Sequence, residues 1–160
     1  MGSRVFVAMS GGVDSSLAAA LLTEAGYDVI GITLGLWAEE GPEPRRRICC
    51  SLEGADDARR ACHNLDIPFY MLNFEPEFQD HVIDYFCQEY SHGRTPNPCL
   101  ACNDKIKFEF LLKMALASGA DYLATGHYAR IDHSRGRFRL LKGIDRAKDQ
   151  SYVLYTVGQA

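Results

Sequence analysis

A short run of glycines and hydroxyl side chains near the start of the chain could bind a phosphate. It lies between the apolar residues 5–9 and an Ala/Leu-rich segment, and its order is Ser10-Gly11-Gly12-Val13-Asp14-Ser15-Ser16. This order predicts a strand, a glycine turn and a helix start, whose backbone N–H groups and dipole favour an anion. The serine hydroxyls add donors, and Asp14 beside a polyphosphate is explained if its carboxylate holds Mg²⁺. The alternative is an ordinary strand-to-helix turn with a serine cap.

The glycine run differs from the common phosphate-binding motifs. It lacks the Gly-Lys-Ser/Thr of a Walker A loop, and serine stands where the dinucleotide fingerprint has its third glycine. It resembles the PP-loop signature SGGxDS of the ATP pyrophosphatases, which cut ATP between the α and β phosphates and adenylate an oxygen of their substrate. The resemblance implies ATP and Mg²⁺ as ligands. The loop alone does not choose between amide-forming synthetases and tRNA-modifying enzymes.

A second segment that could do chemistry carries two cysteines three residues apart. It precedes a predicted helix and reads Thr95-Pro96-Asn97-Pro98-Cys99-Leu100-Ala101-Cys102-Asn103. A helix start and the nearby Lys105 and Lys107 favour the thiolate, which is the form needed in a nucleophile, a sulfur carrier or a metal ligand. Three interpretations stay open on the residues alone: a reactive thiol, a metal or [4Fe–4S] site, and inert thiols.

The sequence indicates no functional role for the remaining four of the six cysteines. Cys62 and Cys87 occur among apolar residues in helical patterns, so both are predicted to lie in the core. Cys49 and Cys50 follow residues 39–47, a segment without apolar side chains that is predicted to be a mobile loop. Six cysteines without a secretion signal argue against a disulfide scaffold and for a reducing compartment. We therefore expect a cytoplasmic protein, with no membrane as partner.

The elements that position these residues alternate along the chain. Short apolar runs predict strands over 4–9, 28–33, 68–73 and 121–125, and helical patterns occupy 14–25, 52–65, 75–90 and 103–118. This alternation predicts an α/β fold, a Rossmann-like parallel sheet with helices on both faces. Ligands of such sheets bind beyond the carboxyl ends of the strands. The glycine turn at 11–12, Leu34 and Gly126-His127 all fall at that edge.

The pattern changes after Tyr128. Alternating residues over 128–131 and 137–141 predict a β-hairpin, and a further helix is expected to start at Asp149. Residues 130–148 hold seven Lys or Arg against two Asp, a net charge of +5 that leaves −9 for the rest of the chain. A local basic arm on an acidic body is typical of an edge that faces nucleic acid, although a solvated hairpin would also fit.

The order of the motifs resembles one family over essentially the whole chain. The PP-loop, the cysteine segment at 93–103, Ile106-Lys107-Phe108, 124–128 and 148–152 follow one another as in the tRNA-specific 2-thiouridylase (MnmA) family. The resemblance implies ATP-dependent thiolation of the wobble uridine (position 34) of tRNA through an adenylated C2–O intermediate, with release of AMP and pyrophosphate. It also implies two partners, tRNA and a sulfur donor such as a cysteine desulfurase or a sulfur relay protein.

The resemblance assigns site residues position by position. ATP would contact Ala8, Met9, Ser10, Gly11, Gly12, Val13, Asp14, Ser15, Leu34 and Gly126. The target base would face Asn97, Pro98 and Cys99, and the tRNA would contact His127, Lys148, Asp149 and Gln150.

The two cysteines carry the sulfur chemistry in this resemblance. Cys102 matches the first catalytic cysteine, which in one version releases sulfur from a persulfide by forming a disulfide. Cys99 stands where some members have aspartate, and this favours a second version in which Cys99, Cys102 and a downstream cysteine hold a [4Fe–4S] cluster whose open iron binds hydrosulfide. The second catalytic cysteine and the central and C-terminal β-rich domains of the family are not among these residues. Residues 1–160 are therefore predicted to be a truncated catalytic domain that binds ATP but does not complete thiolation.

Two alternatives from other classes stay open. One is a PP-loop synthetase that adenylates a small molecule for amide formation, although paired thiols have no use in that reaction. The other is a non-catalytic module clipped by a metal, although Asp14 beside a phosphate loop has no use there.

Overall fold

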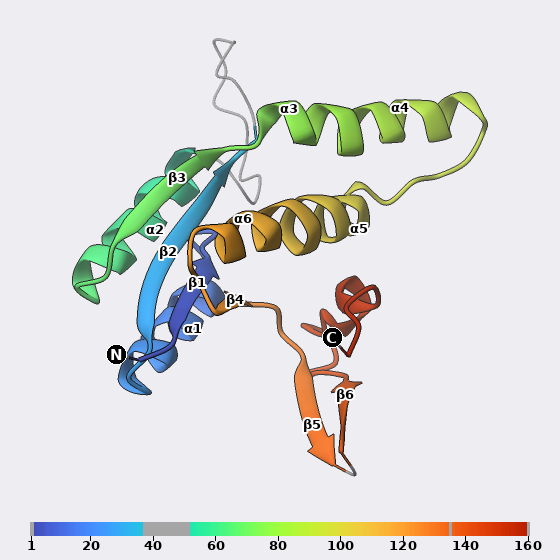
Figure 1. The fold of residues 1–160 in the computed structure, drawn as a ribbon. Coiled ribbons are helices and arrows are strands. Elements are labelled where there is room, and N and C mark those ends of the chain that lie inside the picture. Colours follow the sequence, from blue (N-terminus) through green and yellow to red (C-terminus); the bar gives the residue numbers. More distant parts are fainter. Residues whose placement is uncertain (1, 37–51, 135, 160) are drawn as a thin grey trace.

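The chain folds around a four-stranded parallel sheet (Figure 1). The computed structural model describes residues 2–36, 52–134 and 136–159. The strands lie in the order β3-β2-β1-β4, with bounds β1 Arg4–Ala8, β2 Asp28–Gly35, β3 Phe69–Asn73 and β4 Tyr122–Thr125. All three strand pairs are parallel, so the carboxyl ends of the strands meet at one edge. The predicted strands are confirmed to within two residues at each end.

One face of the sheet is covered by α1 (Val13–Glu24) and α2 (Leu52–Asn64). Alternate residues of β1 point to this face, where Val5 and Val7 pack with Ala19 of α1 and with Cys62 of α2. Each of these four side chains is at most 1% exposed. Strands buried on both faces have no polar side, which explains the continuous apolar run of β1.

Two long helical segments cover the other face. One joins α3 (Glu75–Phe78), η1 (Gln79–Ile83) and α4 (Asp84–Ser91), and the other joins α5 (Pro98–Ala101), η2 (Cys102–Leu111) and α6 (Leu112–Ala117). Phe6 and Ile32 of the sheet pack with Val82, Ile106 and Leu111 of these helices. Helices therefore lie on both faces, as the alternation predicts.

The sequence missed two features of the long helices. Both η1 and η2 are π-helical, whereas the pattern predicts uninterrupted α-helices. The second helix also begins at Pro98 rather than near 103, because the Asn97 side chain caps it and proline suits the first helical position.

The two cysteines predicted to lie in the core differ. Cys62 is 0% exposed, but Cys87 is exposed, so that prediction is wrong for Cys87. The reason is the position of α4, which extends past the sheet and has no buried residue (Figure 1). An apolar pattern buries a side chain only where a partner covers that face.

The chain after β4 leaves the sheet and forms a separate hairpin. Its strands β5 (Arg130–Ser134) and β6 (Arg137–Leu141) pair antiparallel, which confirms the predicted hairpin. The helix expected from Asp149 is a single 3₁₀ turn, η3 (Ser151–Leu154). The predicted loop at 39–47, with Cys49 and Cys50, lies outside the described residues. Within the described part of the chain, no helix is long and apolar enough to cross a membrane.

Candidate nucleotide and thiol site

The glycine turn after β1 has the close packing that a phosphate loop needs. Gly11 has a φ of +77°, a conformation that L side chains rarely adopt. A Cβ atom at this position would lie 2.7 Å from the Cα atom of Gly54 in α2. Both the backbone conformation and the neighbouring helix therefore require glycine here.

The N-terminus of α1 is open to an anion. Its N-cap is Gly12, which has no side chain to bond the first N–H groups of the helix. The hydroxyls of Ser15 and Ser16 both donate to the Gly12 carbonyl, at 3.0 and 3.1 Å. These two hydroxyls shape the turn, and the Ser10 hydroxyl accepts from the Gly12 N–H at 3.4 Å. The uncapped backbone N–H groups of the first helical turn add donors for a phosphate.

Asp14 lies in the first turn of α1 and is exposed. A magnesium ion in a nucleotide site is commonly held by one or two carboxylates together with phosphate oxygens. One exposed carboxylate at the mouth of a phosphate loop fits that donor set. The residue can therefore take the metal-holding role that the sequence predicts.

The end of β4 lies against the start of α1. A Cβ atom at Gly126 would overlap the backbone of Ser15, so glycine is required for this approach. The side chain of Leu34 is only 3% exposed and belongs to the core, so a nucleotide could meet this residue only through its main chain. The three segments predicted to share the carboxyl edge are thus placed there.

His127 follows Gly126 and is held by its neighbours. Its Nδ1 lies 2.8 Å from the Thr125 hydroxyl, and its ring contacts Phe108 of η2, with ring centroids 5.9 Å apart. Burial and the nearby Lys107 ammonium lower the pKa of His127 to about 4. The imidazole is therefore neutral at pH 7 and can donate or accept one hydrogen bond at its other nitrogen.

The cysteine helix presents one thiol to solvent and one to the core. The Asn97 side chain accepts hydrogen bonds from the N–H groups of Cys99 and Leu100, at 3.1 and 3.2 Å, and so fixes the first turn. Cys99 is exposed, while Cys102 is 8% exposed and packs in the same cluster as Leu34. Cys102 therefore belongs to the core between the sheet and the two long helical segments.

The donor set for a [4Fe–4S] cluster is incomplete in the described part of the chain. Cys99 and Cys102 lie one turn apart on the same helix, but no group of three or more His, Cys, Asp or Glu side chains among the described residues could hold a metal ion. Such a cluster needs at least three protein ligands to leave one iron open. Cys99 and Cys102 supply two of these ligands, so a cluster would need one further cysteine.

The basic arm (residues 130–148) shows a contact that the sequence did not reveal. Asp149 and Gln150, both predicted to contact tRNA, point their side chains at Gly143, Ser151 and Tyr128. These bonds join residues up to 22 positions apart, so no local pattern signals them. His127 directly precedes Tyr128, and Lys148 directly precedes Asp149, so both of these predicted tRNA contacts are next to this hydrogen-bonded segment in the sequence.

A hollow of about 510 Å³ between the two long helices was also missed. Its lining includes Asn97, Leu100, Tyr85 and Tyr155. These residues come from three distant parts of the chain, and only the fold brings them together. The hollow adjoins Asn97, one of the three residues predicted to face a target base.

A parallel sheet with a glycine loop against an open helix N-terminus defines a Rossmann-like nucleotide-binding domain. The chain belongs to the family described as tRNA methyl transferase HUP domain, whose profile matches residues 3–160. Its fold is similar to that of a predicted subunit of tRNA methyltransferase from Methanocaldococcus jannaschii. That similarity has a TM-score of 0.53 at 22% identity and covers 83% of this chain and 58% of that one.

Curated relatives are more similar in sequence. A tRNA-specific 2-thiouridylase MnmA of Moorella thermoacetica is 60% identical over 156 residues, which is 96% of this chain and 44% of the relative. The protein of the same name from Clostridium perfringens is 57% identical over 157 residues, 98% of this chain and 44% of that protein. The chain thus spans less than half the length of these relatives.

Proposed function

We propose that this chain is the nucleotide-activating part of an enzyme that thiolates the wobble uridine (position 34) of tRNA at C2. The observation that carries the proposal is the glycine loop at the open N-terminus of α1, in a domain whose second helical layer carries Cys99 and Cys102 one turn apart. Cys102 belongs to the apolar cluster that also contains Leu34 of β2. A phosphate site and a thiol pair in one domain suit a reaction that first activates an oxygen and then replaces it with sulfur. The similarity to 2-thiouridylases supports this choice of substrate.

The glycine loop would supply the activation step. Its backbone N–H groups bind the phosphates of ATP, and Asp14 with phosphate oxygens would hold Mg²⁺, which neutralises the developing charge. The C2 oxygen of the uridine, turned out of its stack, attacks the α-phosphate and releases pyrophosphate. The resulting adenylated C2–O bond has AMP as its leaving group.

The cysteine helix, which begins at Pro98, would serve the second step, the transfer of sulfur to C2. A persulfide sulfur, loaded by a sulfur donor onto a second cysteine, attacks C2 and displaces AMP. The Cys102 thiolate then attacks the inner sulfur, so that a disulfide forms and 2-thiouridine leaves. Asn97 would hold the first turn of this helix, with Pro98 and Cys99, against the target base. Because the second cysteine is not in this chain, residues 1–160 alone are expected to bind ATP and not to complete thiolation.

The test separates activation from sulfur transfer in the full-length gene product. Asp14→Ala is expected to lower AMP and pyrophosphate release with tRNA and ATP by at least tenfold, because the metal loses its carboxylate. The matched control is Glu24→Ala, which removes an exposed carboxylate from the far end of the same helix and should leave release unchanged. Unchanged release in Asp14→Ala would refute the activation step.

A second measurement addresses the alternatives. Protein prepared without oxygen is assayed for iron, acid-labile sulfide and 2-thiouridine formation together. Full activity in an iron-free sample supports the persulfide route, whereas activity that follows iron content would replace it with a cluster on Cys99 and Cys102. ATP turnover that needs an amino donor and no tRNA would instead indicate a small-molecule synthetase.

A further inference from the structure

The Asp149 carboxylate, directly after the basic arm, accepts three hydrogen bonds. Its Oδ1 atom accepts hydrogen bonds from the Gly143 N–H at 2.7 Å and the Ser151 N–H at 3.2 Å. Its Oδ2 atom accepts from the Ser151 hydroxyl at 2.9 Å. The bond from Gly143, together with those from Ser151, lowers the pKa of Asp149, so the carboxylate is charged at neutral pH. This side chain ties both ends of the loop 143–151 together.

Gln150 ties the same loop to the segment that follows β4. Its Oε1 atom accepts from the Tyr128 N–H at 2.9 Å, and its own N–H donates to the Tyr128 carbonyl, also at 2.9 Å. The side chain and the main chain of Gln150 thus pair with one residue, as a strand partner would. Tyr128 directly follows His127, so the loop is fixed next to the nucleotide edge.

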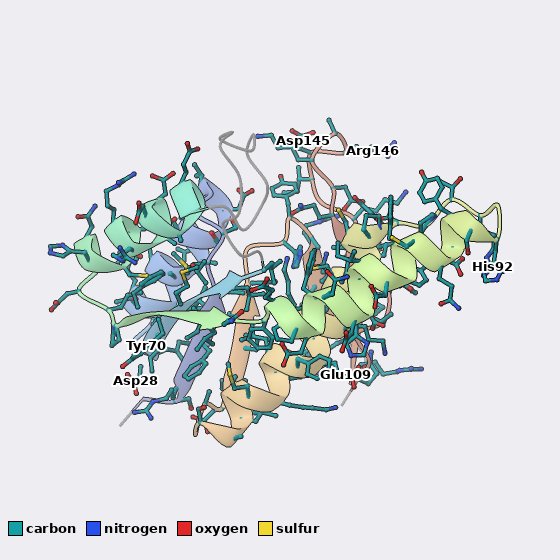
Figure 2. All side chains as sticks on the ribbon, turned by 90° about the horizontal axis from the view of Figure 1, so that it is seen from above. Asp28, Tyr70, His92, Glu109, Asp145 and Arg146 are labelled. Carbon is teal, nitrogen blue, oxygen red and sulfur yellow. The ribbon has the colours of Figure 1, made fainter. Side chains whose placement is uncertain are left out.

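The Tyr128 ring closes the contact from the other side. A Cβ atom at Gly143 would lie 2.6 Å from the ring, and the Tyr128 hydroxyl accepts from the Asp145 N–H at 3.3 Å. Figure 2 shows Asp145 and Arg146 at the outer end of this loop, away from the sheet. The inner residues of the loop are therefore held, while Asp145 and Arg146 at its tip face outward.

We propose that Tyr128, Gly143, Asp149 and Gln150 form a clasp that positions the loop cations Lys142, Arg146 and Lys148 to bind the phosphates of the tRNA. Asp149 and Gln150 are then positioning residues whose side chains do not touch the RNA. The proposal rests on tRNA being the substrate, and it assigns these two residues a role different from the direct contact that the sequence predicts.

The direction in which RNA affinity changes when the Asp149 charge is removed distinguishes direct contact with RNA from positioning of the loop. A carboxylate that faces RNA repels phosphates, so removing its charge alone should tighten binding. A carboxylate that orders the loop acts in the opposite direction, because its removal releases the cations from their fixed positions. The loop offers a matched pair, since the Asp145 carboxylate accepts a local bond, from the Ala147 N–H at 2.9 Å, and no long-range bond from any other described residue.

The experiment compares Asp149→Ala with Asp145→Ala in the full-length protein, using fluorescence anisotropy with a labelled tRNA transcript. Losing the hydrogen bonds to a charged group is expected to weaken binding by Asp149→Ala on the order of tenfold. Asp145→Ala should bind as tightly as the parent protein or more tightly. Equal or tighter binding by Asp149→Ala would overturn the clasp.

Amide hydrogen exchange in the absence of RNA provides an independent readout. Gln150→Glu keeps an acceptor for the Tyr128 N–H and should keep that amide protected, whereas Gln150→Met should speed its exchange and also weaken RNA binding. Weaker binding by Gln150→Met with unchanged protection would mean that Gln150 contacts RNA directly, which overturns the positioning role. If the parent protein binds no tRNA, the proposed function fails, while the exchange data still decide whether the clasp exists.

Discussion

At the scale of single residues, His127 is unusual because its surroundings keep the imidazole neutral at pH 7. Its ring is half-buried between Thr125, Phe108 and the neighbouring Lys107. A histidine next to a basic arm that is proposed to bind RNA would usually be expected to supply a positive charge. Here its environment removes that charge, so any contact it makes with RNA is a neutral hydrogen bond or a stacking contact.

The lowered pKa of His127 predicts how stability depends on pH. Because the folded pKa of about 4 is below the ordinary value of 6.5, the unfolded chain binds more protons between these values. The stabilising contribution is complete above pH 6.5 and is lost as the pH falls toward 4. Allowing for partial exposure, we expect about 1–2 kcal/mol.

The measurement is urea unfolding at pH 7 and at pH 4.5. The parent protein should lose more stability on acidification than His127→Gln does, by about 1–2 kcal/mol. A His63→Gln variant is the control, since His63 lies in the last turn of α2 and is exposed. An equal loss in the parent and in His127→Gln would contradict the neutral, buried imidazole.

At the scale of elements, β2 and α2 approach so closely that only glycine fits between them. A Cβ atom at Gly31 would overlap Sγ of Cys62, which is 0% exposed. Gly31→Ala is therefore expected to destabilise the fold by about 1–3 kcal/mol through overpacking. Chemical denaturation of both proteins measures the difference.

The matched background for this substitution is Cys62→Ala, which removes the obstructing sulfur. In that background, Gly31→Ala should be neutral or stabilising, because the next contact of the new Cβ is ordinary at 3.4 Å from Met9. The coupling between the two substitutions would then be about 1–3 kcal/mol. Additive effects would show that the Cys62 contact is not what excludes alanine.

The elements also show what the sequence can and cannot predict. Strands and helices follow from local periodicity, and the glycine loop and cysteine helix were predicted from residue types at fixed spacing. The start of α5 at Pro98 and the π-helical η2 were missed, because a cap and an i→i+5 bonding pattern are not visible in apolar periodicity. Cys87 was misjudged, and the hydrogen bonds of Asp149 and Gln150 to Gly143 and Tyr128 were not foreseen, because both depend on which distant segment lies opposite.

At the scale of the whole molecule, charge is divided between two parts. Residues 130–148 carry +5 and the rest of the chain −9. Within the arm, Arg139 is paired with Asp132, and the Arg130 side chain donates to the Lys142 carbonyl. An acidic body repels RNA except where the arm projects, so charge division would direct the tRNA to one edge of the molecule.

This division predicts that the position of a cation, rather than the net charge, sets the salt dependence of RNA binding. Arg146→Ala removes a cation from the outer end of the arm, whereas Arg60→Ala removes one from α2, where it pairs with Asp57. Both variants change the net charge by the same amount.

Each phosphate contact contributes a slope of about −0.9 to the plot of log affinity against log salt for a duplex and about −0.7 for a single strand. Titrations of labelled tRNA at several KCl concentrations measure this slope. For Arg146→Ala the slope should be shallower by about 0.7–0.9, whereas Arg60→Ala should keep the slope of the parent protein. Equal slopes for the two variants would mean that the RNA responds only to the total charge and that the arm has no particular role in binding it.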